Sequence, residues 1–180
     1  MKRLIALMLG LAAALVLPPA TAEAENATSH YLLVMEEPNF GLAPNGDQIA
    51  ISGEAEYSVG PKSVAGTGSF THTDAAGDVL ATGTWEATGL IDYQSYGCGV
   101  VFGTQIPSNF CGGRVAMRVV LTTPLGQLPA ILTVVCVIGP NPPNSVISSG
   151  DRSEGAMLSV PGVINFNHTA GGDNLIIQTG

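Results

Sequence analysis

The sequence predicts an all-β protein: a single antiparallel β-barrel or two-sheet β-sandwich of about 8–10 strands, following an N-terminal signal peptide. Short β-type runs alternate with Gly, Pro and Asn roughly every ten residues, which is typical of sandwiches and barrels. Charged residues make up only 11 % of the 180-residue chain, unlike a helical protein rich in Glu, Lys and Arg. Apolar residues reach 46 %, too many for a disordered chain.

The first 22 residues have the layout of a secretory signal peptide. Lys2 and Arg3 precede an uncharged apolar run over residues 4–17, and Ala20-Thr21-Ala22 supplies small residues for cleavage. The apolar run is shorter than the roughly 20 residues that a membrane-spanning helix needs, although a short membrane anchor is the alternative. We expect cleavage after residue 22, or after residue 24, and one domain over residues 23–180 in a secreted or periplasmic protein.

The predicted mature chain is strongly acidic. Loss of Lys2 and Arg3 leaves four basic residues against 14 acidic ones, a net charge of about −10. Nucleic-acid binding depends on Lys and Arg contacts with phosphate. We therefore expect no nucleic-acid partner, and no membrane span in the mature chain.

The first strands are predicted at residues 30–35 and 48–59, on either side of a loop rich in Gly, Pro and Asn. Within residues 48–59, apolar side chains such as Ile49 and Ile51 alternate with polar ones such as Glu54 and Glu56. One face is therefore buried and the other solvated, as in an antiparallel sheet.

The clearest local unit is a β-hairpin over residues 64–93. Residues 74–77, Asp-Ala-Ala-Gly, have the Asp and Gly positions of a type I turn. We expect a register in which Trp85 lies across from Gly66. This register places the apolar side chains on one face, because a slip of one residue would invert one strand. That face holds Phe70, His72, Val79, Ala81, Trp85, Ala87, Ile91 and Tyr93.

Four later segments complete the predicted sheet. Residues 114–121 alternate in polarity, whereas residues 130–138 are apolar on both faces apart from Thr133 and predict a central strand. The last two strands are expected at residues 156–166 and 174–178. No helix longer than two turns is expected after the signal peptide.

Cysteine use fits an exported protein. Cys98 and Cys111 flank a loop rich in Gly, Pro, Ser and Asn, where a disulfide is expected in an oxidising compartment. Cys136 lies in an apolar strand and is expected to be a free, buried thiol. The other two pairings of the three cysteines remain open at this point.

The chain contains none of the local catalytic or phosphate-binding motifs that a sequence can reveal, such as G-x-S-x-G, H-E-x-x-H or C-x-x-C. His30, His72 and His168 are far apart, and a zinc site needs three or four converging ligands. We therefore predict no catalytic residues, no metal and no cofactor, and expect Glu54 and Glu56 to lie on a solvated face.

One segment is the best candidate for binding. Residues 93–113 combine aromatic side chains with five glycines and a predicted disulfide, a combination found in ligand-binding loops. His72 is expected at the rim of the core, where its ring could act as a general base or a ligand contact. The alternatives are a loop that only covers the end of the sheet and an ordinary core histidine. The predicted ligand-binding set is His72, Tyr93, Tyr96, Phe102 and Phe110.

These observations favour a secreted, non-enzymatic binding or surface-interaction module, with a small or apolar molecule as its ligand. One alternative is a barrel-type enzyme, such as an isomerase or cyclase, whose apolar pocket shapes its substrate. Another is a structural component of the cell envelope. A pocket with apolar walls would favour the first two hypotheses, and a filled core with a flat exposed face would favour the third.

Overall fold

The computed structural model describes residues 29–143 and 154–180, which are all-β and contain no helix. The signal peptide predicted for residues 1–22 lies outside this part. No helix that could cross a membrane occurs in the described residues. The strands of the described part are β1 (His30–Leu42), β2 (Gln48–Val59), β3 (Lys62–Thr73), β4 (Val79–Cys98), β5 (Val100–Val101), β6 (Thr104–Gln105), β7 (Phe110–Thr123), β8 (Gly126–Cys136), β9 (Gly155–Val160), β10 (Ile164–Phe166), β11 (His168–Gly171) and β12 (Asn174–Gln178).

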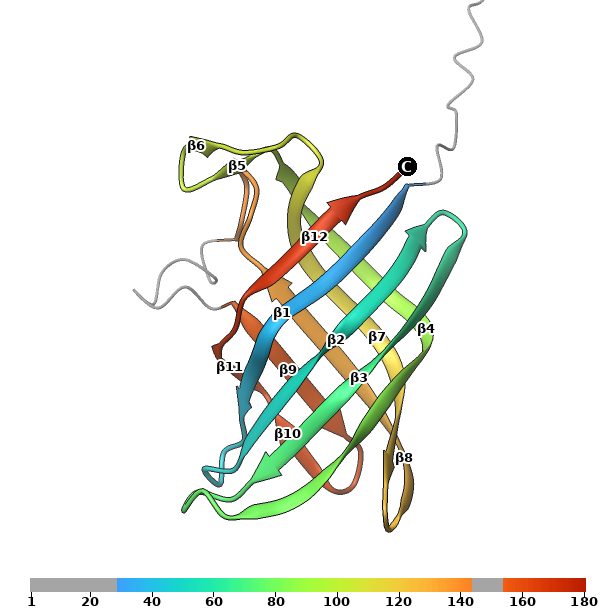
Figure 1. The fold of residues 1–180 in the computed structure, drawn as a ribbon, viewed down its shortest axis with the longest axis vertical. Helices are drawn as coiled ribbons and strands as arrows, with labels where there is room; N and C mark the ends of the chain where they lie inside the picture. Colours follow the sequence, from blue (N-terminus) through green and yellow to red (C-terminus); the bar gives the residue numbers. More distant parts are fainter. Residues whose placement is uncertain (1–28, 144–153) are drawn as a thin grey trace, which may run out of the picture.

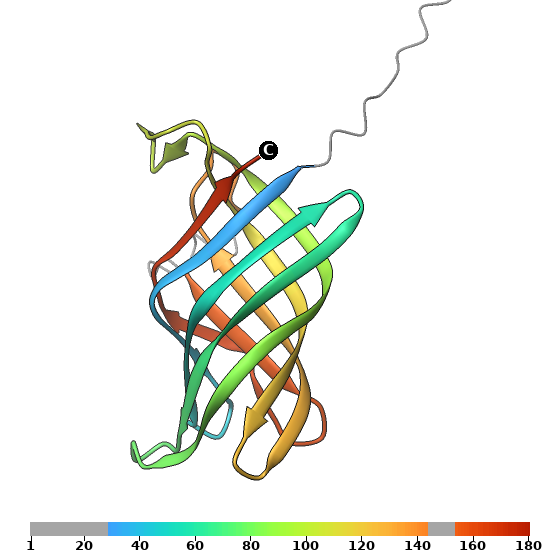
Figure 2. The same cartoon turned by 45° about the vertical axis from the view of Figure 1, so that its right-hand side comes forward.

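One large antiparallel sheet contains all of these strands except β5 and β6, as the alternating polarity predicted. The sheet follows the order β10-β9-β8-β7-β12-β1-β2-β3-β4. In addition, β4, the last strand of this order, pairs along its other edge with β7. The succession of pairings from β7 through β12, β1, β2, β3 and β4 therefore returns to β7. Figures 1 and 2 show the strands wrapping around a common axis.

The molecule has two distinct ends (Figure 1). The turns after β1, β3, β7 and β9 gather at the lower end, which we call the turn end. It comprises residues 43–47, 74–78, 124–125 and 161–163. The segment carrying β5 and β6, the start of β1 and the C-terminus lie at the opposite end, which we call the loop end.

Some predicted strand limits are wrong. Strand β1 continues through residues 38–42, where a loop was expected, because a bulge between Met35 and Asn39 lets pairing with β2 resume. The single strand expected at residues 156–166 is a hairpin of β9 and β10. Gly162, with a φ of 76°, supports its turn, and the Val163 amide donates to the Val160 carbonyl.

The predicted register of the β3–β4 hairpin is also wrong, by two residues. Gly68, and not Gly66, lies opposite Trp85. One residue of the difference arises at the turn, where the Asp74 amide donates to the Asp78 carbonyl and these two residues close the loop. The other is a β-bulge in β4 just after the turn.

The error of two residues leaves most side chains on the predicted face, because the side-chain period of a strand is also two. Val79, which was expected inside, is 62 % exposed. Further bulges in β4 bury Leu90 in place of the predicted Ile91, which is half-buried.

Trp85 lies in a packed middle layer of the interior. Its side chain is 1 % exposed, and its indole N–H donates to the Ser52 carbonyl at 2.9 Å. Close glycines make room for the ring, since a Cβ on Gly68 would lie 2.4 Å from the indole nitrogen. Fully buried aliphatic side chains from the surrounding strands complete the layer, including Ile51, Met117, Val119 and Leu132.

The predicted disulfide between Cys98 and Cys111 is confirmed. It links β4 to β7 at the loop end, where the two residues face each other in the ladder. Cys136 is a free cysteine and is fully buried, also as predicted. Its strand β8 is central, with β7 and β9 on its two edges.

Candidate functional site

An apolar pocket of about 120 Å³ lies at the turn end, and we call it the end pocket. Seven strands contribute to its walls, because their alternating side chains point into the same interior. His72 and Thr123 are the only lining residues with polar side chains. The lining consists of Ile49, Phe70, His72, Ala81, Leu121, Thr123, Leu128, Leu158, Val160, Val163, Ile164 and Phe166.

The pocket has a firm floor and an open rim. Leu158 and Phe166 are 1 % exposed and belong to the buried core, so their positions are fixed by packing. Leu128 and Val163 are 37 % and 64 % exposed and therefore form the rim. An engineered cavity of about 150 Å³ with apolar walls binds benzene. The end pocket is thus of the size that takes one ring or a short alkyl branch.

His72, which lines this pocket, forms a histidine–carboxylate pair with Asp47. His72 Nε2 lies 2.9 Å from Asp47 Oδ2, and the two side chains are 18 % and 12 % exposed. The hydrogen bond with His72 lowers the pKa of Asp47, which is therefore ionised at neutral pH. Because an ionised carboxylate only accepts hydrogen bonds, His72 donates through Nε2–H.

Two further contacts fix the geometry of the pair. The Asp47 amide donates to the side-chain oxygen of Asn45 within the β1–β2 turn, at 3.2 Å. The His72 ring packs edge-on against Phe166, with centroids 5.1 Å apart. The sequence alone indicated His72 but gave no reason to pair it with Asp47, 25 residues earlier in another turn.

The five residues of the predicted binding set do not lie together. His72 lines the end pocket, whereas Tyr93, Tyr96, Phe102 and Phe110 belong to the last part of β4, the disulfide loop and the start of β7. The separation follows from the 20 residues of β4, which carry the chain from the turn end to the loop end. Tyr96 is 2 % exposed, Phe110 is half-buried and Phe102 is 52 % exposed.

Tyr93 belongs to a cluster of three tyrosines inside the loop end. Its ring centroid lies 4.9 Å from that of Tyr31 and 5.2 Å from that of Tyr57, and its hydroxyl donates to the Gly112 carbonyl. The Tyr57 hydroxyl is buried without a hydrogen-bond partner among the described residues, and burial raises the pKa of Tyr57. This cluster fills the loop end with aromatic surface.

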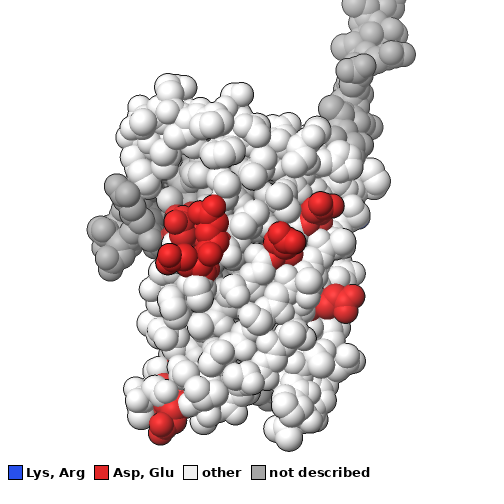
Figure 3. Space-filling model, in the orientation of Figure 1, with Lys and Arg blue, Asp and Glu red and all other residues white. Residues whose placement is uncertain are grey.

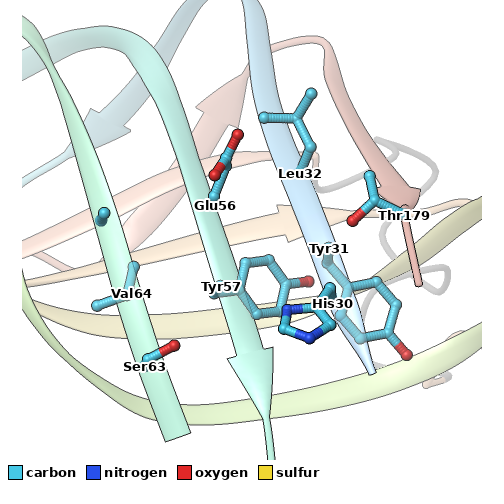
Figure 4. A pocket seen from close by; sticks show the side chains of 9 residues that line it. His30, Tyr31, Leu32, Glu56, Tyr57, Ser63, Val64 and Thr179 are labelled. Atoms are coloured by element: carbon cyan, nitrogen blue, oxygen red, sulfur yellow. The ribbon is translucent and has the colours of Figure 1, made fainter. Parts of the chain in front are cut away.

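A second, wider depression of about 440 Å³ lies beside the tyrosine cluster (Figure 4). The first residues of β1, the last of β2 and the first of β3 form it, with Thr179 from the C-terminus. Its lining mixes exposed polar side chains such as His30 and Glu56 with apolar ones such as Leu32. A solvent-exposed lining of polar and apolar side chains binds an apolar molecule weakly, so the end pocket is the stronger candidate site.

A buried polar cluster lies between β1, β8 and β12, and no local sequence pattern indicates it. Asn174 donates through Nδ2 to Asn39 Oδ1 at 2.7 Å and to the Val135 carbonyl at 2.9 Å, and the Cys136 thiol donates to the Asn174 carbonyl. Burial raises the pKa of nearby Glu154 to about 7 and that of Cys136 to about 12. Neither of the two pockets described above includes these residues, and they join β1, β8 and β12 where β1 changes partners.

Among the described residues, no group of three His, Cys, Asp or Glu side chains is placed to hold a metal ion. Comparison of the chain with protein-family models, with curated proteins and with solved structures gives no match. Function is therefore inferred below from the chemistry of the end pocket.

Proposed function

We propose that the protein is an exported, non-enzymatic binding module that holds a small apolar molecule in the end pocket of a closed β-barrel. The barrel interpretation is supported by the ring of pairings that returns from β4 to β7. The observation that carries the binding proposal is a pocket with almost wholly apolar walls and a single oriented histidine. Such pockets bind by apolar burial and use a few polar groups to orient the ligand.

Export is supported by the disulfide in the described residues and by the signal-peptide layout of the first 22 residues. A disulfide of this kind persists outside the cytosol, in the periplasm or the extracellular space. The protein would therefore meet its ligand in one of these compartments.

The volume of the pocket limits the affinity that a single ring can reach. Burying each CH₂ contributes about 0.8 kcal/mol, so a six-carbon ring contributes about 5 kcal/mol before the costs of association. Since the costs of association offset part of this contribution, a Kd of about 1 mM or weaker is expected for the ring alone, and tighter binding for a larger ligand that also covers Leu128 and Val163 at the rim.

The test is a thermal-shift screen with toluene, p-cresol and hexanol, followed by titration calorimetry on two filled-pocket variants. Ala81→Leu places extra volume in the end pocket, and Ala65→Leu does the same in the depression of Figure 4. We expect Ala81→Leu to abolish binding and Ala65→Leu to leave it unchanged. The reverse result would place the site at the loop end and refute the proposal.

A second function, an enzyme of the isomerase or cyclase type, is favoured by the His72–Asp47 pair. A carboxylate that orients a histidine is the arrangement used for general-base catalysis. The two functions differ in what happens to the ligand. A binding module returns it unchanged after incubation, whereas an enzyme returns an isomer that proton NMR distinguishes and that Asp47→Asn no longer forms.

A further inference from the structure

Large apolar side chains protrude from three neighbouring turns around the mouth of the end pocket. Val79 and Leu80 follow the β3–β4 turn, Leu125 lies in the β7–β8 turn and Val163 in the β9–β10 turn. They are 62 %, 56 %, 99 % and 64 % exposed, respectively. We call these four residues the apolar tips.

The apolar tips are concentrated at one end of the molecule. At the loop end, the exposed large apolar side chains of the described residues are Val59 and Phe102. Single exposed apolar residues are normal on a protein surface, but a group around a pocket mouth marks an interaction site. The turn end is therefore a candidate docking surface.

The charge of the turn end narrows the choice of partner. Asp74 and Asp78 lie in the β3–β4 turn, and the acidic group at the lower left of Figure 3 lies at this end. The described cations lie elsewhere: Lys62 begins β3 beside Asp92, and Arg114 and Arg118 lie within β7, away from its turn. An anionic surface would thus be repelled and would find no basic contact.

We propose that the apolar tips insert into an uncharged, zwitterionic lipid surface, with the mouth of the end pocket facing the lipid. Stable protein interfaces bury about 800 Å² per partner with close shape complementarity. The four side chains protrude from three separate turns around an opening. A lipid surface accommodates such side chains without shape complementarity, and each buried apolar side chain adds to binding.

This docking is independent of the ligand, because Val79, Leu80 and Leu125 do not line the end pocket. If the proposed function also holds, docking would give the ligand a direct path from the lipid into the end pocket. A molecule dissolved in the lipid could then enter the pocket between Leu128 and Val163 without crossing water.

The experiment is flotation of the purified exported protein with phosphatidylcholine vesicles, without added ligand. We expect the wild type to float and the double variant Leu80→Ser/Leu125→Ser to lose at least about tenfold in partitioning. Val59→Ser, which removes an exposed apolar side chain at the loop end, is the matched control and should float like the wild type. Added phosphatidylglycerol should weaken flotation. Leu125→Ser alone, at a side chain that is 99 % exposed, keeps the test valid if the double variant does not fold.

The proposal is overturned if the wild type does not float, if the serine variants float equally well, or if anionic lipid strengthens binding. It is also overturned if the tips instead bury one another between two copies. Sedimentation without vesicles would then show a dimer that Leu125→Ser dissociates. Failure of flotation with intact ligand binding would remove the docking surface and leave the end pocket as the binding site.

Discussion

Replacement of Trp85 by alanine tests the packing of the middle layer most directly. The side chain is 1 % exposed and is one of the largest fully buried groups. Truncation of a buried aromatic residue costs about 3–5 kcal/mol, because apolar contacts are lost and a cavity remains. The glycines that make room for the ring have no side chains to refill the cavity, so we expect a value in the upper half of this range.

The hydrogen bond of the indole adds a second component that can be separated. Trp85→Phe keeps an aromatic ring but removes the N–H that donates to the Ser52 carbonyl at 2.9 Å. A buried carbonyl left without its partner costs about 1–3 kcal/mol. Trp85→Phe should therefore be destabilising, but less so than Trp85→Ala.

The measurement is urea unfolding followed by far-ultraviolet circular dichroism. Fluorescence cannot compare the variants, because Trp85 is the only tryptophan of the chain. Unfolding free energies from linear extrapolation give the difference between wild type and variant. A loss below about 1 kcal/mol for Trp85→Ala would refute the packed layer and would mean that the ring is accessible to solvent or to a ligand.

Three further predictions concern the site and the cysteines. His72→Ala should weaken binding of a ligand found in the screen by about fivefold, as expected for one lost contact of about 1 kcal/mol, while Phe102→Ala should leave the Kd unchanged in calorimetry. The pKa of Asp47 is lowered in the fold, so its stabilisation is present above its ordinary pKa and is lost as the pH falls through the folded value. The stability advantage of the wild type over Asp47→Asn should therefore persist at neutral pH and disappear in acid, and an advantage that grows below pH about 4 would contradict the assigned hydrogen bond. Cys136 is fully buried and burial raises its pKa to about 12, so iodoacetamide should label it only in urea, and mass spectrometry that finds labelling of the native protein would contradict its burial.

Local patterns were sufficient to predict an all-β, antiparallel fold. The alternation of Ile49 and Ile51 with Glu54 and Glu56 marks a strand, and β2 covers the predicted residues 48–59. The disulfide was also predictable, since its loop composition and spacing are local features. Such features depend on near neighbours in the chain and need no knowledge of tertiary structure.

Register and site were harder to predict because they depend on residues far apart in sequence. Turn composition indicated a hairpin at residues 74–77 but not the closing pair or the bulge that follows, so Trp85 was placed opposite the wrong glycine. The inward direction of His72 could be derived from alternation. Its partner Asp47 could not, because only the pairing of β2 with β3 brings the two turns together.

The packed middle layer also explains why binding chemistry is expected at the ends of the sheet and not at its centre. Trp85 and the aliphatic side chains around it fill the interior between the end pocket and the tyrosine cluster. At the turn end, Leu128 and Val163 remain partly exposed over buried Leu158 and Phe166. A ligand can therefore reach a rigid apolar floor without opening the core, which would cost several kcal/mol. The floor of the end pocket is therefore part of the core, and only its rim is free to adapt to a ligand without loss of core packing.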